Sequence, residues 1–133
     1  MKILVVDDEA HILDKLPKAF TKFYPKAIVD TAWTYLQAEK LLKENVYNLI
    51  LLDGQLLDYK TEIWQHAFGY CLIDPIRKSS SKDAKIIMIS GDKSMRRQGI
   101  SEGADFGIDK NLFFKNEEVV NSLNLEFKLS KGL

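Results

Sequence analysis

Charged and hydroxyl side chains follow the short apolar runs of this sequence. Asp53 directly ends the run LILL at 49–52, although a carboxylate is among the side chains least often buried without a partner. Similar groups follow three other apolar runs, namely Asp7, Asp8 and Glu9; Ser90, Gly91 and Asp92; and Asp109 and Lys110. If these runs are parallel strands of one sheet, the groups lie at its carboxyl edge, where open α/β sheets bind ligands.

The residue types in this set suit phosphoryl transfer. Mg²⁺ prefers a few carboxylate oxygens together with water and a phosphate oxygen, and it offsets the repulsion between carboxylates that lie close together. A carboxylate is also a nucleophile toward a phosphoryl group, whose equatorial oxygens must be neutralised during transfer. Mg²⁺ on Asp7 and Asp8, the Lys110 ammonium and the Ser90 hydroxyl are groups of that kind. The pattern predicts a magnesium site that Asp53 faces.

Each of these residues also has a purely structural interpretation. Asp7 and Asp8 can cap a following helix, Asp53 can be a solvated turn residue, and Lys110 can be a surface lysine. Their joint occurrence after successive predicted strands favours the chemical interpretation.

Two kinds of segment alternate along the chain and predict its scaffold. Apolar runs occur at 3–6, 27–32, 48–52, 85–89 and 105–109. Stretches with helical spacing follow them, one entered through a Thr34–Gln37 capping pattern and the last from about residue 116. This alternation predicts an α/β fold, with a parallel sheet covered by helices on both faces. No repeat or linker divides the sequence, so we expect a single domain over 1–133.

The overall composition restricts the class of protein. The 133 residues include 19 basic and 19 acidic ones, and a chain without net charge has no general attraction to nucleic acid or anionic membranes. No apolar run approaches the roughly 20 residues that cross a bilayer. The first residues lack the pattern of a signal peptide, and the single cysteine, Cys71, allows no internal disulfide. We expect a soluble, cytoplasmic domain with no direct nucleic-acid or membrane partner.

The segments ILVVDDE, LILLD, IIMIS and GADFGIDK, in this order, resemble the receiver domain of two-component response regulators. The resemblance covers essentially the whole chain. It implies a flavodoxin-like, doubly wound sheet of five parallel strands in the order 2-1-3-4-5. Because no further domain follows the last predicted helix, we expect a stand-alone receiver of the chemotaxis or phosphorelay type.

The resemblance also implies how the acidic residues act. Asp53 would be the phosphoacceptor, which takes a phosphoryl group from the phosphohistidine of a histidine kinase or a His-containing phosphotransfer protein. Mg²⁺ would be held by Asp7, Asp8 and Asp53 together with the backbone carbonyl of Gln55. The domain would be a phosphoacceptor signalling module that catalyses only its own phosphorylation and dephosphorylation.

The remaining functional residues are implied in the same way. Ser90 and Lys110 match the hydroxyl and lysine residues that contact the phosphoryl group in this family. Gln55 and Asp92 stand two residues beyond the acceptor and the hydroxyl residue, and we expect them to tune the lifetime of the phosphate. A downstream protein would bind the surface formed by the fourth helix, fifth strand and fifth helix, or the segment described next.

The segment 54–68 is longer than the family's usual loop after the acceptor by about eight residues, or two helical turns. Its apolar residues predict a short helix. We interpret the insert as a lid or a partner-docking element, in which Tyr59, Trp64 and Phe68 are the candidate contacts. A surface loop without function is the alternative.

Two further positions depart from the family pattern. Gly107 stands where the family usually has a Tyr or Phe that moves with the hydroxyl residue upon phosphorylation. Asn111 replaces a proline that usually follows the lysine through a cis bond. A cis bond before Asn costs about 2.5–4 kcal/mol. We therefore expect either a trans bond with a shifted start of the last helix, or a strained cis bond.

Two other functions compete with a working receiver. A receiver-like scaffold that no longer switches would bind its partner constitutively; Gly107 and the insert favour it, whereas the intact acidic, hydroxyl and lysine set argues against it. A haloacid-dehalogenase-type phosphohydrolase also uses a strand-end aspartate with Mg²⁺. Such an enzyme generally needs a second acid two residues after the aspartate, where this chain has Gln55. It also has its acidic pair late in the chain, whereas Asp7 and Asp8 come first here.

Overall fold

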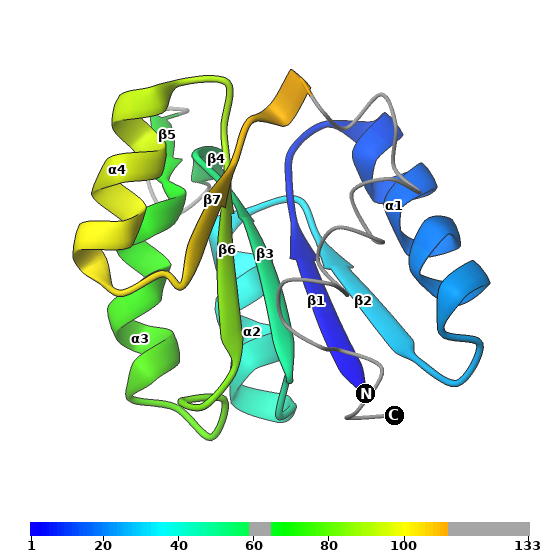
Figure 1. The fold of residues 1–133 in the computed structure, drawn as a ribbon. Coiled ribbons are helices and arrows are strands. Elements are labelled where there is room, and N and C mark those ends of the chain that lie inside the picture. Colours follow the sequence, from blue (N-terminus) through cyan, green and yellow to red (C-terminus); the bar gives the residue numbers. More distant parts are fainter. Residues whose placement is uncertain (59–64, 112–133) are drawn as a thin grey trace.

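Five strands form one parallel sheet in the computed structural model of the protein, which describes residues 1–58 and 65–111 (Figure 1). They are β1 (Lys2–Val6), β2 (Ile28–Ala32), β3 (Leu49–Asp53), β6 (Lys85–Ile89) and β7 (Phe106–Ile108). Their order across the sheet is β2-β1-β3-β6-β7, and every neighbouring pair is parallel. Counted within this sheet alone, the order is second, first, third, fourth, fifth. The predicted fold class and strand order are confirmed.

Helices cover both faces of the sheet (Figure 1). They are α1 (Ala10–Phe23), α2 (Tyr35–Glu44), the 3-10 helix η1 (Gly69–Leu72), α3 (Ile73–Arg77) and α4 (Lys93–Glu102). Leu49 and Leu51 of β3 pack with the α1 side of the core, while Ile50 and Leu52 pack with the α2 and α3 side. All five residues of β3 are buried, which explains why its sequence is apolar without alternation.

The start of α2 follows the predicted capping pattern. The Thr34 hydroxyl oxygen accepts a hydrogen bond of 3.0 Å from the Gln37 backbone N–H. The Gln37 side-chain oxygen in turn accepts one of 3.0 Å from the Trp33 backbone N–H. The first bond satisfies a donor that the first turn of a helix leaves without an intrahelical partner, and the second ties the residue before the cap to the same turn. The last predicted helix, from about residue 116, lies outside the described residues.

The insert does not form the predicted helix where the structure describes it. Strand β4 (Gln55–Asp58) pairs antiparallel with β5 (Gln65–Phe68), and residues 59–64 lie outside the described part of the chain. The Gly69 N–H donates a hydrogen bond of 3.0 Å to the Gly54 carbonyl. Because the insert leaves and rejoins the domain at one point, an antiparallel pair satisfies the backbone of its two ends, whereas a helix would carry them apart.

Gly69 returns the chain very close to the acceptor strand. A Cβ at this position would lie 1.8 Å from the Asp53 carbonyl oxygen, which is far inside the contact distance. Glycine is required here by the approach of two backbones. Among the described residues, no helix has both the length and the apolar character needed to cross a membrane.

We predict that Gly69→Ala lowers the free energy of unfolding by about 2 kcal/mol, because the added methyl group overpacks against backbone that cannot move alone. The matched control is Gly91→Ala, since nothing lies within 4 Å of the place that its Cβ would take. Urea denaturation followed by circular dichroism measures both. Equal midpoints for the two variants would show that the close approach at Gly69 is not maintained in solution.

Candidate functional site

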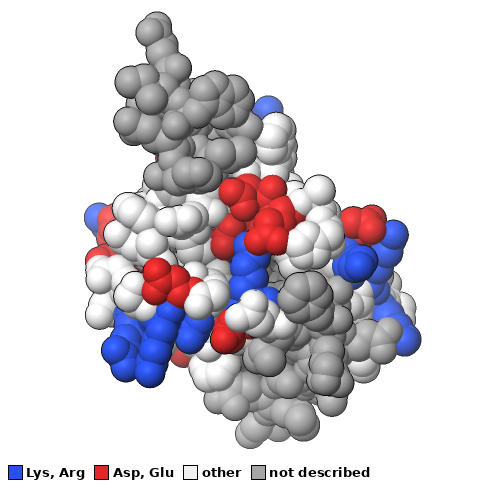
Figure 2. Space-filling model, turned by 90° about the horizontal axis from the view of Figure 1, so that it is seen from above, with Lys and Arg blue, Asp and Glu red and all other residues white. Residues whose placement is uncertain are grey.

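A cavity opens at the carboxyl edge of the sheet, above β1, β3, β6 and β7. Its volume is about 300 Å³. Figure 2 shows acidic side chains gathered in the middle of this face. The lining residues come from the ends of the strands and from the segments that follow them: Asp8, Glu9, Asp53, Gln55, Ser90, Gly91, Asp92, Met95 and Lys110.

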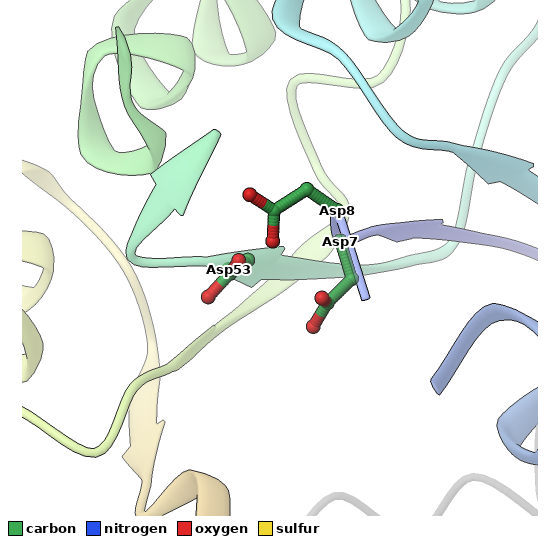
Figure 3. Close-up of side chains that lie close together, drawn as sticks. All are labelled: Asp7, Asp8 and Asp53. Carbon is green, nitrogen blue, oxygen red and sulfur yellow. The ribbon is translucent and has the colours of Figure 1, made fainter. Parts of the chain in front are cut away.

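Three carboxylates meet at this cavity. Asp7, Asp8 and Asp53 each offer an oxygen within 4.8 Å of the others, and Figure 3 shows Asp7 and Asp8 beside Asp53. Asp7 and Asp53 are only 1% and 6% exposed. One Asp7 oxygen accepts a hydrogen bond of 2.8 Å from the Glu9 backbone N–H, which holds the turn after β1. The sequence pattern predicted these residues at one edge, and the structure places them there.

Lys110 is the cation of this cluster. Its Nζ lies 3.0 Å from Asp53 Oδ1 and 3.2 Å from either carboxylate oxygen of Asp7. The closest oxygen is Glu9 Oε1 at 2.6 Å. One ammonium therefore serves several carboxylates, and among the described residues of the cluster negative charge is in excess.

Burial and the neighbouring charges both shift the pKa values of this cluster. Burial, followed by the charge of Asp7, raises the pKa of Asp53 to about 7, although Lys110 acts in the opposite direction. Burial also raises the pKa of Asp7 above its ordinary value. For Lys110, burial alone would lower the pKa, but the hydrogen bond to Glu9 and the charges of Asp7 and Asp53 raise it overall. The site is electrostatically suited to receive another cation.

The donor set fits Mg²⁺, which takes oxygen ligands and usually keeps several waters. Asp7, Asp8 and Asp53 provide the oxygens from one small region, and the cavity leaves room for water beside them. Gln55 also lines the cavity, as the first residue of β4. Its carbonyl as a further ligand remains a prediction.

Ser90 and Asp92 also line the cavity, where the chain leaves β6. The Ser90 Oγ accepts a hydrogen bond of 3.0 Å from the Asp92 backbone N–H. The Asp92 Oδ1 accepts hydrogen bonds from the Ser94 N–H at 2.8 Å and the Ser94 hydroxyl at 2.7 Å, so that Asp92 caps α4. The bonds from the Ser94 hydroxyl and N–H lower the pKa of Asp92. Asp92 thus has a structural role, and its effect on phosphate lifetime remains a prediction.

The structure tests the predicted departures from the family pattern to different extents. No cis peptide bond occurs among the described residues, so the bond between Lys110 and Asn111 is trans, as one of the two alternatives predicted. Of the three candidate contacts in the insert, Tyr59 and Trp64 lie outside the described residues. Phe68 is 38% exposed and stacks on Tyr70, with ring centroids 5.4 Å apart.

Two residues near the site were not predicted from the sequence. Met95 lines the cavity from the first turns of α4. The Arg96 Nη1 donates a hydrogen bond of 2.6 Å to the Ser90 carbonyl. The one sequence feature that could have indicated Arg96 is Gly107, because the arginine stem lies over this glycine.

The chain belongs to the response regulator receiver domain family, whose model matches residues 3–124. A search of curated proteins found no match. Among solved structures, a CheY-like receiver domain protein from Methanospirillum hungatei JF-1 is 25% identical, with a TM-score of 0.67, and the match covers 94% of this chain and 97% of that one.

Two other solved structures are similar. The receiver domain of NtrX from Brucella abortus is 26% identical, with a TM-score of 0.70 and coverage of 93% of this chain and 98% of that one. A protein from Chloroflexus aurantiacus J-10-fl described as a response regulator is 23% identical, with a TM-score of 0.73 and coverage of 92% and 93%. The chain is therefore a phosphorylatable signalling domain of two-component systems.

We predict that Asp53→Asn stabilises the protein at pH 8 in the presence of a chelator. The wild-type carboxyl has its pKa raised from 3.8 to about 7, so folding favours its protonated form. The stability that this preference adds to the folded protein is complete below pH 3.8 and is lost as the pH rises through 7. The neutral amide avoids the loss, and we expect a gain of at least about 1 kcal/mol, since one pKa unit corresponds to about 1.4 kcal/mol.

Thermal unfolding between pH 4 and 8 measures this effect, with the exposed Asp83→Asn as the control. Added Mg²⁺ should stabilise the wild type, by about 2.7 kcal/mol at a hundredfold excess over its dissociation constant, and Asp53→Asn by much less. A variant that is less stable than the wild type at pH 8 would indicate that the ion pair with Lys110 outweighs the repulsion.

Proposed function

We propose that this receiver accepts a phosphoryl group onto Asp53, with Mg²⁺, from the phosphohistidine of a cytoplasmic histidine kinase or phosphotransfer protein. One observation carries the proposal. The Asp53 carboxylate ends the central strand β3, next to Asp7 and Asp8 and 3.0 Å from the Lys110 ammonium. A nucleophile, the ligands for a cation and a fixed positive charge thus lie around one small cavity.

In the transfer step, an Asp53 carboxylate oxygen forms a P–O bond while the P–N bond of the donor breaks. The electron pair of the broken bond stays on the imidazole nitrogen, which takes a proton from water. Lys110 and the Ser90 hydroxyl contact the phosphoryl oxygens as the charge moves onto them. When bound, Mg²⁺ would neutralise charge on these oxygens as a Lewis acid, held by Asp7, Asp8, Asp53 and the Gln55 carbonyl.

The phosphorylated domain then signals by binding another protein, or relays the phosphoryl group onward. Ile100 on α4 is 50% exposed and Phe106 on β7 is 39% exposed, which supports a protein contact at the surface of the fourth helix and fifth strand. Phe68 at the end of the insert offers a second exposed aromatic side chain near the cavity. Gln55 and Asp92 line the cavity, which supports a role for both in the lifetime of the phosphate.

A constitutive scaffold is the second candidate function, and Gly107 is the observation that favours it. Without a ring at this position, the family's usual link between the hydroxyl residue and the output surface is missing. The two functions differ in a measurable way, because a scaffold binds its partner equally well whether or not Asp53 is modified.

We predict that the wild type gains one phosphoryl group when it is incubated with Mg²⁺ and acetyl phosphate, which loses acetate in the transfer. Intact-mass spectrometry measures the gain. It should be absent with chelator and in Asp53→Asn, and present in Asp83→Asn, which leaves the cavity unaltered. A folded wild type that gains no phosphoryl group, either from acetyl phosphate or from a purified histidine kinase, would contradict the proposal and favour the scaffold.

A further inference from the structure

Arg96 connects α4 to the residues that we assign to the phosphoryl group. Its Nη1 donates a hydrogen bond of 2.6 Å to the Ser90 carbonyl oxygen. The same oxygen accepts a hydrogen bond of 3.2 Å from the Lys110 backbone N–H. One backbone oxygen therefore joins Ser90, Lys110 and Arg96.

Gly107 creates the space that allows this contact. A Cβ on Gly107 would lie 3.1 Å from the Arg96 Cβ and 3.6 Å from its Cγ and Cδ. The aliphatic stem of Arg96 thus occupies the space that a larger side chain at position 107 would need. The absence of a side chain at Gly107 and the path of the Arg96 stem are therefore linked.

The contact has the properties of a strong and directed hydrogen bond. A guanidinium stays charged at all relevant pH values, and bonds with one ionised partner are roughly twice as strong as neutral ones. Arg96 is partly buried, which limits competition from water. The Ser90 Oγ also accepts from the Asp92 N–H at the start of α4, so that both oxygens of Ser90 are tied to this helix.

We propose that Arg96 is a positioning residue for phosphoryl transfer. It holds the Ser90 carbonyl, which in turn fixes the Ser90 residue and the Lys110 backbone. The Ser90 hydroxyl and the Lys110 ammonium are thereby positioned for the phosphoryl oxygens. Arg96 is absent from the cavity lining, so it acts through Ser90 and Lys110. This inference rests on the proposed phosphorylation of Asp53.

The test compares phosphorylation rates with acetyl phosphate at saturating Mg²⁺. Arg96→Met keeps a long stem over Gly107 without a donor, and we expect its maximal rate to fall about tenfold, because misplaced catalytic groups slow a reaction strongly. Arg96→Lys keeps a cationic donor and should recover most of the rate. The control is Arg97→Ala, an exposed neighbour on the same helix. The Mg²⁺ dissociation constant should be unchanged in all variants, since Asp7, Asp8 and Asp53 remain.

Gly107→Ala tests the hydrogen bond between Arg96 and Ser90 by a substitution on β7. The added methyl group pushes on the Arg96 stem and should slow phosphorylation in the wild-type background. In the Arg96→Met background it should cause no further slowing, because the bond to Ser90 is already absent. The carbonyl ¹³C chemical shift of Ser90 reports that bond directly, and it should move in Arg96→Met and Gly107→Ala but not in Arg97→Ala.

The outcomes separate the inference from the function on which it rests. Phosphorylation of Arg96→Met at the wild-type rate, with a wild-type Ser90 shift, overturns the positioning role and leaves the phosphoacceptor role intact. Equal slowing in Arg96→Lys and Arg97→Ala, or weaker Mg²⁺ binding, also overturns it, because the effect is then a general disturbance of α4. A wild type that gains no phosphoryl group overturns both.

Discussion

The meeting of buried carboxylates around one ammonium group is the constraint on which this structure depends. Asp7 and Asp53 are almost without exposure, and the Lys110 Nζ lies within 3.2 Å of both. Charges removed from water are costly unless they are paired and hydrogen-bonded. The rigid parallel sheet makes the pairing possible, because β1 and β3 are pinned on both faces and deliver the two carboxylates to one point. The apolar strands and the charged edge are thus parts of one arrangement.

The departures from the family pattern are concentrated around this edge, and two of them depend on a missing Cβ. Gly69 lets the hairpin of β4 and β5 close directly onto the Asp53 carbonyl. Gly107 lets the Arg96 stem pass over β7 toward Ser90. In each case glycine is used for close approach and not for an unusual backbone angle. The scaffold keeps the family's order of strands, while the surroundings of the acceptor are rebuilt.

The scaffold and the charged residues could be predicted from the sequence because both follow local rules. Apolar β-branched runs mark the strands, and the carboxyl ends of parallel strands gather at one edge, so the order of the residues alone places Asp7, Asp53, Ser90 and Lys110 together. The hairpin could not be predicted, since the spacing of apolar residues in 54–68 suits a helix as well, and the choice depends on where the ends must meet. The bond from Arg96 to Ser90 depends on how α4 packs on β7, which the polar sequence of this helix does not encode locally.

The charge balance of the site indicates which contacts of Lys110 a modification at Asp53 would change. A phosphoryl group adds about two negative charges to a cluster that already has an excess of carboxylates. Asp7 is buried and held by the Glu9 N–H, whereas the Glu9 side chain is 42% exposed and can turn to water. Glu9 is therefore the partner that Lys110 can release most easily. The Lys110 backbone N–H and the Arg96 guanidinium both donate to the Ser90 carbonyl, so hydrogen bonds connect the lysine to α4 although position 107 has no aromatic ring.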